Sequence, residues 1–132
     1  MIKRDFRILL VEDHPFQLIA LQVLLNNHGL YRLTPVLDAN EALIAIERST
    51  EPYDLLLCDQ RLPGISGVEL IELASQTGMV RNGVLLSGLD PQKLAAIGFQ
   101  AIARGLPLLG CLSKPLNTLD LLRLVAPVRE HG

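Results

Sequence analysis

Short runs of consecutive apolar residues alternate along this 132-residue chain with longer stretches whose apolar residues recur at helical spacing. Four of the runs are apolar at successive positions, which is typical of parallel strands covered by helices on both faces of a sheet. These runs are residues 8–11, 55–58, 84–86 and 108–112. A weaker fifth run, residues 31–37, includes Arg32, Thr34 and Pro35, and this mixed polarity predicts a strand at the sheet edge.

Helix starts are marked between these runs. Pro15 and Pro91 stand where a first helical residue needs no amide donor, and the residues before them are candidate caps: Asp13 or His14, and Asp90. Capping pairs mark three more starts: Asp38 with Glu41, Ser66 with Glu69, and Asn117 with Asp120. The fifth helix is expected to end before Pro127.

Two of the helical stretches carry apolar residues at the spacing of a single helix face. In the first stretch they are Phe16, Ile19, Ala20, Val23 and Leu24, and in the second they are Leu94, Ile97, Gly98 and Ala101. We expect each set to pack on the sheet. The whole pattern predicts an α/β fold with residues 1–132 in one domain: a doubly wound, flavodoxin-like (βα)5 sheet of five parallel strands, in the order 2-1-3-4-5 if strand one neighbours strand three.

Composition removes several classes of protein. Twelve Lys and Arg against fourteen Asp and Glu give a net charge of −2, which does not favour binding to nucleic acid or to an anionic membrane surface. The apolar runs are far shorter than the roughly 18 residues that span a bilayer. Cys58 and Cys111 lie inside apolar runs, so we expect buried free thiols and a reducing, cytoplasmic location rather than a disulfide or zinc framework.

Polar residues follow the predicted strands at their carboxyl ends. Glu12 and Asp13 follow the first strand and Asp59 the third, while Ser87 follows the fourth and Lys114 comes just after the fifth. In the order 2-1-3-4-5 these ends meet at one edge of the sheet, so three carboxylates share a crevice. Taken alone, Asp13 is more simply a helix cap, Ser87 a turn hydroxyl and Lys114 a surface lysine.

Carboxylates placed so close raise one another's pKa unless a cation neutralises them, and an oxygen-rich cluster suits Mg²⁺ better than zinc. The predicted ligands are Glu12, Asp13, Asp59 and the backbone carbonyl of Arg61. A phosphoryl group beside the ion would find donors in Lys114 and Ser87, so the pattern predicts phosphoryl transfer with Asp59 as acceptor. His14 is read as a surface residue near a helix start, although it could accept or relay a proton.

The order and spacing of these motifs resemble the receiver domains of two-component response regulators. The resemblance rests on the segments ILLVEDHP, DLLLCDQRLPGISGVEL, VLLSGLD and LSKP, and covers nearly the whole chain. It implies transfer of a phosphoryl group to Asp59 from a phosphohistidine on a sensor histidine kinase or phosphotransfer protein, with Mg²⁺ held by Glu12 and Asp13. It also implies contacts from Lys114 and Ser87 to the phosphoryl oxygens, and a cis peptide bond between Lys114 and Pro115.

Two departures from the family pattern qualify what is carried over. Receivers usually have Tyr or Phe three residues before the lysine, where this chain has Cys111, so the aromatic ring that reorients on activation is missing. The interval from Ser87 to Lys114 is longer than usual by about one helical turn. With its ending GLPLLGCLSKP, this longer segment resembles receivers that precede cyclic-di-GMP phosphodiesterase domains.

The expected function is therefore a phosphorylation-controlled signalling module rather than a turnover enzyme, with self-directed phosphotransfer and autodephosphorylation only. A C-terminal output domain and a homodimer are arrangements that this resemblance allows. The alternative, motivated by Cys111, is a receiver-like interaction module that works independently of phosphorylation. A haloacid-dehalogenase-type phosphatase fits less well, because that family needs a second acid where this chain has Arg61.

Overall fold

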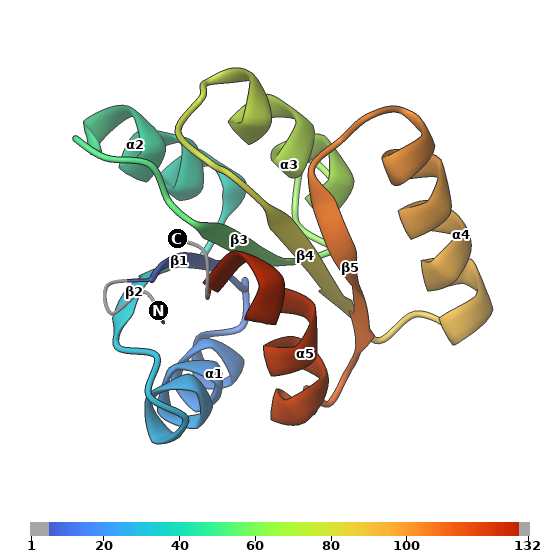
Figure 1. Ribbon diagram of the computed structural model, residues 1–132, viewed down its shortest axis with the longest axis horizontal. Coiled ribbons are helices and arrows are strands. Elements are labelled where there is room, and N and C mark those ends of the chain that lie inside the picture. The colour runs from blue at the N-terminus through green and yellow to red at the C-terminus, as the bar shows by residue number, and fades with distance from the viewer. Residues whose placement is uncertain (1–5, 130–132) are drawn as a thin grey trace.

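Five parallel strands form one sheet, and a helix follows each strand along the chain (Figure 1). This computed structural model describes residues 6–129. The strands are β1 (Arg7–Val11), β2 (Arg32–Val36), β3 (Leu55–Asp59), β4 (Gly83–Ser87) and β5 (Leu108–Ser113); the helices are α1 (Pro15–Asn27), α2 (Ala39–Arg48), α3 (Gly67–Gln76), α4 (Pro91–Ala103) and α5 (Thr118–Arg129). The strand order is β2-β1-β3-β4-β5, as the sequence predicts, with β2 at an edge.

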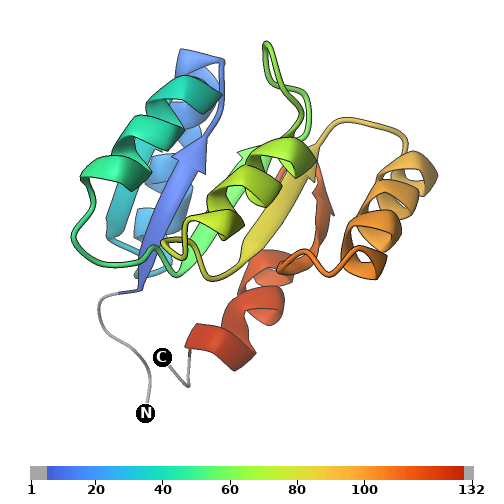
Figure 2. The same cartoon turned by 90° about the horizontal axis from the view of Figure 1, so that it is seen from above.

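Helices cover both faces of the sheet, with α1 and α5 on one side and α2, α3 and α4 on the other (Figures 1 and 2). Alternate residues of each central strand therefore enter different cores. In β1, Ile8 and Leu10 pack with α1 and α5, whereas Leu9 and Val11 pack on the opposite face. Burial on both faces is the reason why the central strands are apolar at successive positions.

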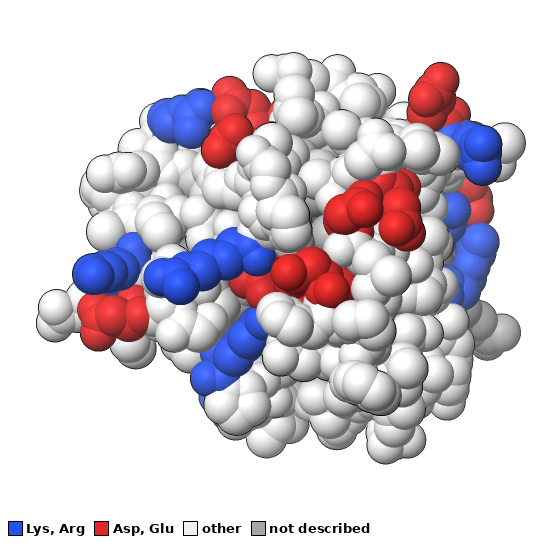
Figure 3. Space-filling model, turned by 180° about the vertical axis from the view of Figure 1, so that it is seen from behind, with Lys and Arg blue, Asp and Glu red and all other residues white. Residues whose placement is uncertain are grey.

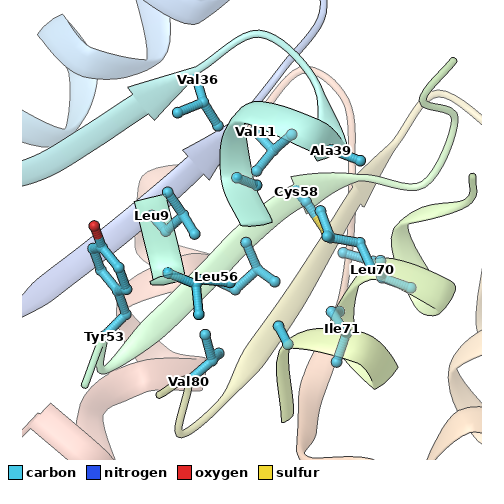
Figure 4. Packing of buried hydrophobic residues seen from close by; sticks show 14 of the residues in the cluster. Leu9, Val11, Val36, Ala39, Tyr53, Leu56, Cys58, Leu70, Ile71 and Val80 are labelled. Atoms are coloured by element: carbon cyan, nitrogen blue, oxygen red, sulfur yellow. The ribbon is translucent and has the colours of Figure 1, made fainter. Parts of the chain in front are cut away.

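The core beneath α2 and α3 is drawn in Figure 4, where Cys58 of the sheet lies beside Leu70 of α3, and Leu9, Leu56 and Ile71 belong to the same cluster. All of these side chains are buried. Strand β5 departs from the expectation of full burial, because it lies at the other sheet edge: Leu108 is buried, but the residues after it are only partly covered.

Most of the predicted helix starts are confirmed. Ser66 and Glu69 form a complete capping box at α3, and the carboxylates of Asp38 and Asp90 accept the expected backbone N–H bonds at α2 and α4. Asn117 caps α5 through its side-chain oxygen. The expected end of α5 is wrong: the helix continues through Pro127 to Arg129.

The predicted packing face of α1 is wrong. Phe16, Ile19 and Val23 lie on the solvent side, with 87% of Phe16 exposed, and the helix is buried instead through Leu18 and Leu25. This helix is apolar nearly all round, so its spacing does not select one face. In α4 the expected face is confirmed, because Leu94, Gly98 and Ala101 are buried, with Ile97 partly buried beside them.

Candidate functional site

Two acidic residues from adjacent strands meet at the carboxyl end of the sheet. Asp59 is the last residue of β3 and Glu12 directly follows β1, whose Val11 pairs in register with Cys58. Both carboxylates are buried, Glu12 to 99% and Asp59 to 93%. Such burial of two like charges requires a positive partner.

Lys114 supplies that positive charge. Its Nζ donates hydrogen bonds to Asp59 Oδ2 at 2.6 Å and to Glu12 Oε1 at 3.0 Å. The lysine is placed by β4, because its backbone N–H donates to the carbonyl of Ser87 at 2.8 Å. Residues separated by 102 positions in the sequence, Glu12 and Lys114, are therefore joined directly.

Burial and neighbouring charges shift the pKa values of Glu12 and Lys114 in opposite directions. Burial raises the pKa of Glu12, and its contacts with Lys114 only partly offset the effect. For Lys114, burial by itself lowers the pKa, but the hydrogen bonds to Asp59 and Glu12 outweigh it and raise the pKa above the ordinary value. Lys114 is therefore a firmly protonated cation between the two acids at neutral pH.

The loop after Asp59 is held in a fixed shape. Asp59 Oδ1 accepts the backbone N–H of Arg61 at 3.0 Å, and Gln60 Oε1 accepts the N–H of Val68 at 3.1 Å. Gly67 lies directly against Asp59: a Cβ at this glycine would come within 2.5 Å of the Asp59 carbonyl oxygen. The site therefore requires glycine at this position, and the Asp59 carboxylate is oriented by its own loop.

Ser87 lies at the end of β4, next to β3 in the sheet, and is fully buried. Its Oγ accepts the backbone N–H of Leu89 at 3.1 Å, which turns the chain toward α4. The Lys114–Pro115 peptide bond is cis, as the family resemblance implies. The strand ends thus place Ser87, Lys114 and Asp59 at one edge of the sheet.

A second group of side chains extends the acidic cluster. Glu12, Asp13 and His14 each offer a ligand atom within 4.8 Å of the others. Within residues 6–129, Glu12 Oε2 and Asp13 Oδ1 are buried and accept no hydrogen bond. Buried carboxylate oxygens without donors suit a hard divalent cation such as Mg²⁺, which prefers oxygen ligands.

Sequence reasoning missed one residue of this site. Gln17, on the first turns of α1, accepts a hydrogen bond from Lys114 Nζ at 3.2 Å. His14 is an exposed residue at the start of α1, as expected, and its ring lies beside Glu12 and Asp13. The signal for Gln17 is its spacing, since a residue four positions after Asp13 on a helix projects back toward the same sheet edge.

Comparison with known families decides what this arrangement is. Residues 8–126 match the family described as the response regulator receiver domain. The chain belongs to this family. Its five-stranded order and the acids and lysine at the strand ends fit receivers of two-component signalling, so the domain is a signalling module with a flavodoxin-like fold.

Individual relatives agree with this assignment. The receiver is 31% identical over 113 residues to the cyclic di-GMP phosphodiesterase RocR of Pseudomonas aeruginosa, covering 86% of this chain and 29% of that protein. It is also similar to the signal receiver domain of an HD domain-containing protein from Pseudomonas fluorescens Pf-5, with 28% identity, a TM-score of 0.77 and coverage of 99% and 91% of the two chains. A CheY-like receiver from Methanospirillum hungatei JF-1 shares 26% identity, with a TM-score of 0.74 and coverage of 99% and 96%.

A groove of about 450 Å³ opens beside Lys114 on this receiver. Its walls come from α1, through Gln17, Ala20 and Leu24, and from the segment after β5, through Pro115 and Leu116. The exposed Phe16, Ile19 and Val23 lie on the same helix. The lining of the groove is mainly apolar, apart from Glu12, Gln17 and Lys114.

The position of the missing aromatic ring is taken by a thiol packed against α4. A Cβ at Gly98 would come within 2.7 Å of Cys111 Sγ, so the two residues fit together without spare room. Both cysteines are free, and burial raises the pKa of each thiol. They act as small apolar groups in the packing of this receiver.

On the face drawn in Figure 3, acidic and basic side chains lie in small groups, most of them of mixed sign, separated by uncharged surface. This face therefore presents no single-sign field. Within the part of the chain that the structure describes, no helix is both long enough and apolar enough to cross a bilayer.

Proposed function

We propose that this receiver accepts a phosphoryl group on Asp59 from the phosphohistidine of a sensor histidine kinase or phosphotransfer protein, and so switches a partner or an attached output domain. A cytoplasmic location is part of this proposal. The observation that carries it is the Lys114 ammonium, which bonds Asp59 and Glu12 at the open carboxyl edge of the sheet. The Asp59 carboxylate is thereby held next to the Lys114 ammonium, which could shift to bind the oxygens of an incoming phosphoryl group.

In the proposed reaction an Asp59 carboxylate oxygen attacks phosphorus. The new O–P bond forms as the P–N bond to the donor imidazole breaks, and the imidazole keeps the electron pair and takes up a proton. The Arg61 N–H fixes one carboxylate oxygen. Lys114 and the hydroxyl of Ser87 would donate to the phosphoryl oxygens, and their charge and dipole stabilise the transferred group.

A divalent cation, Mg²⁺, would be held by Glu12, Asp13, Asp59 and the carbonyl of Arg61. The donor set supports this choice, because two buried carboxylate oxygens in the cluster accept no hydrogen bond from residues 6–129. When bound, such an ion neutralises the negative charge shared by phosphate and carboxylates. The protein's own part is to hold the acids in place through β1, β3 and Lys114.

The test is intact-protein mass spectrometry after incubation with Mg²⁺ and a small phosphoryl donor such as acetyl phosphate. We expect the wild-type protein to gain the mass of one phosphoryl group, which hydroxylamine removes because it cleaves acyl phosphates. Asp59→Asn should gain none. As a matched control, Asp38→Asn changes a carboxylate that only caps α2, where asparagine caps equally well, and should be phosphorylated like the wild type.

The competing hypothesis, an interaction module that works independently of phosphate, motivated by Cys111, gives a different result. It requires identical partner binding or self-association for wild type and Asp59→Asn, with and without the donor. It is not favoured, because the chain has the family's acids and lysine at the strand ends. Phosphorylation that persists in Asp59→Asn, or none in the wild type, would refute the acceptor role of Asp59.

The receiver spans less than a third of the RocR relative, so the activity of a longer protein is a separate question. The match to RocR over 86% of this chain supports a place next to a cyclic-di-GMP phosphodiesterase domain. On this proposal the receiver itself turns over no external substrate. The adjoining coding sequence tests whether a phosphodiesterase domain follows the receiver. A DNA-binding domain or a stop codon there would contradict that part of the proposal.

A further inference from the structure

We propose that His14 is a ligand of the divalent ion, giving this receiver a mixed nitrogen and oxygen site that favours ions such as Co²⁺ and Zn²⁺ more than carboxylates alone would. The inference rests on the divalent-ion site of the proposed function. It adds a residue which sequence reasoning leaves on the surface. The candidate ligand atoms are those of three consecutive residues, Glu12, Asp13 and His14.

The spacing of these atoms is that of ligands around one ion. His14 Nδ1 lies 3.2 Å from Asp13 Oδ1 and 3.9 Å from Glu12 Oε2. For metal–ligand bonds of about 2.1 Å, octahedral geometry puts ligand atoms on adjacent corners about 3 Å apart and on opposite corners about 4 Å apart. One ion can therefore contact all three side chains after small rotations.

A separate observation indicates that a ligand is expected here. Glu12 is 1% exposed, and its Oε2 receives no hydrogen bond from any residue that the structure describes, although Oε1 of the same carboxylate is bonded to Lys114. The unbonded oxygen lies 3.9 Å from His14 Nδ1, within the group that these two residues form with Asp13. A buried carboxylate oxygen that accepts no hydrogen bond destabilises the folded protein unless a cation or a hydrogen-bond donor binds it.

The His14 ring does not serve as a helix cap. His14 is the N-cap residue of α1, but its side chain makes no capping hydrogen bond, and 63% of the side chain is exposed. An ion pair with Asp13 is the simpler explanation of the 3.2 Å contact. It is weakened by the finding that Asp13 Oδ1 accepts no hydrogen bond, from His14 or from any other described residue.

The chemical consequence is a change in metal preference. Carboxylate and carbonyl oxygens suit Mg²⁺, whereas an imidazole nitrogen adds affinity mainly for borderline ions such as Co²⁺, Ni²⁺ and Zn²⁺. Loss of the ring should therefore weaken Co²⁺ binding much more than Mg²⁺ binding. The ratio of the two dissociation constants measures the imidazole's contribution without any phosphoryl transfer.

The experiment is isothermal titration calorimetry of metal-free protein with CoCl₂ and with MgCl₂. For His14→Ala we expect the Co²⁺ dissociation constant to rise about tenfold, and that of Mg²⁺ by less than about twofold. His28→Ala is the matched control, because His28 lies beyond the far end of α1, and it should bind both ions like the wild type. His14→Ser, which offers a favoured helix cap, replaces His14→Ala if that variant folds poorly.

Pulsed electron paramagnetic resonance of the Mn²⁺-loaded protein gives direct evidence. Coupling to an imidazole nitrogen should be present in wild type and His28→Ala and absent in His14→Ala. An unchanged ratio of dissociation constants, no bound metal in the wild type, or no nitrogen coupling in it would each overturn the inference. A receiver that takes phosphate on Asp59 without this coupling refutes His14 alone, whereas one that shows the coupling but takes no phosphate refutes the proposed function alone.

Discussion

Each end of the sheet has a buried acidic residue next to a basic one, but the two ends differ in how many hydrogen bonds the acidic oxygens accept. At the amino end, the buried Asp54 accepts the backbone N–H of Arg7 at 2.8 Å and pairs with Arg81 at 3.8 Å. The Arg7 guanidinium bonds to Ser49 and to backbone carbonyls, and lies 4.4 Å from the centre of the Tyr53 ring. At the carboxyl end, Glu12 and Asp13 keep buried oxygens that accept no hydrogen bond from the described residues.

This difference separates a structural charge network from a site that can receive a ligand. Where a buried acid has both a backbone donor and a charged partner, as Asp54 does, it fixes the start of strands β1 and β3. Where acceptors remain without donors and the cation is a flexible lysine, the charges can reorganise around an incoming group. The following four predictions test this contrast, from the largest effect to the smallest.

Removal of the lysine should have the largest effect, because it is the cation of the open end. We expect Lys114→Ala to slow phosphorylation by a small-molecule donor by about 10²- to 10³-fold, the usual loss when a charge-stabilising donor is removed. The rate is followed by intact mass over time. Lys93→Ala, at an exposed lysine of α4, is the control and should react at the wild-type rate. Equal rates for both variants would remove Lys114 from the mechanism.

Gly67→Ala should disturb the open end through shape rather than charge. Its new Cβ would come within 2.5 Å of the Asp59 carbonyl oxygen and 2.8 Å of Leu85 Cδ2, so we expect a loss of about 2–3 kcal/mol in the free energy of unfolding. Urea denaturation measures it. Gly88→Ala provides the comparison, since a Cβ at Gly88 meets nothing within 4 Å. If both variants were equally stable, the proposed close packing under Asp59 would be wrong.

At the closed end, Asp54→Ala should lower the free energy of unfolding by about 2 kcal/mol, because the buried N–H of Arg7 loses its acceptor. Arg81→Ala, which removes the exposed partner, should change it by less than about 0.5 kcal/mol. Under conditions where both variants remain folded, their phosphorylation rates should equal that of the wild type. A slower rate would mean that the two ends are coupled.

The smallest effect is a change in how stability depends on pH. Burial raises the pKa of Glu12 above its ordinary value of 4.5, so this residue stabilises the folded state below about pH 4.5, and the contribution is lost as the pH rises through the raised pKa. Glu12→Gln cannot titrate. Its free energy of unfolding in metal-free buffer should therefore increase relative to that of the wild type as the pH rises above about 4.5. An advantage that shrinks as the pH rises would contradict the sign.

Much of the fold and of the site could be predicted because both follow from topology. Once Asp59, Glu12 and Lys114 are placed after parallel strands in the order 2-1-3-4-5, their convergence needs no detail of packing. The buried face of α1 could not be predicted in the same way. Apolar residues occur nearly all round this helix, so their spacing does not show whether Leu18 or Phe16 faces the sheet. Only the packed neighbours decide between them.

Two other differences between the sequence-based prediction and the structure concern Gln17 and Pro127. Gln17 reaches Lys114 across the gap between a helix and a loop, which no strand-end rule anticipates. The chain also tolerates Pro127 in the last turn of α5, where only Val128 and Arg129 of the helix follow it. The roles of Glu12, Asp13, Asp59, Ser87, Lys114 and the Arg61 carbonyl in binding the ion and the phosphoryl group remain predictions, which the experiments above address.

The fit of Cys111 against Gly98 makes these two positions size-matched partners. A Cβ at residue 98 would collide with the Cys111 sulfur in its present position, and a ring that pointed the same way from residue 111 would meet Gly98 of α4. An aromatic residue at position 111 in the orientation of the present thiol is therefore incompatible with α4 where it now stands. Restoring one would first require helix α4 to stand farther from strand β5.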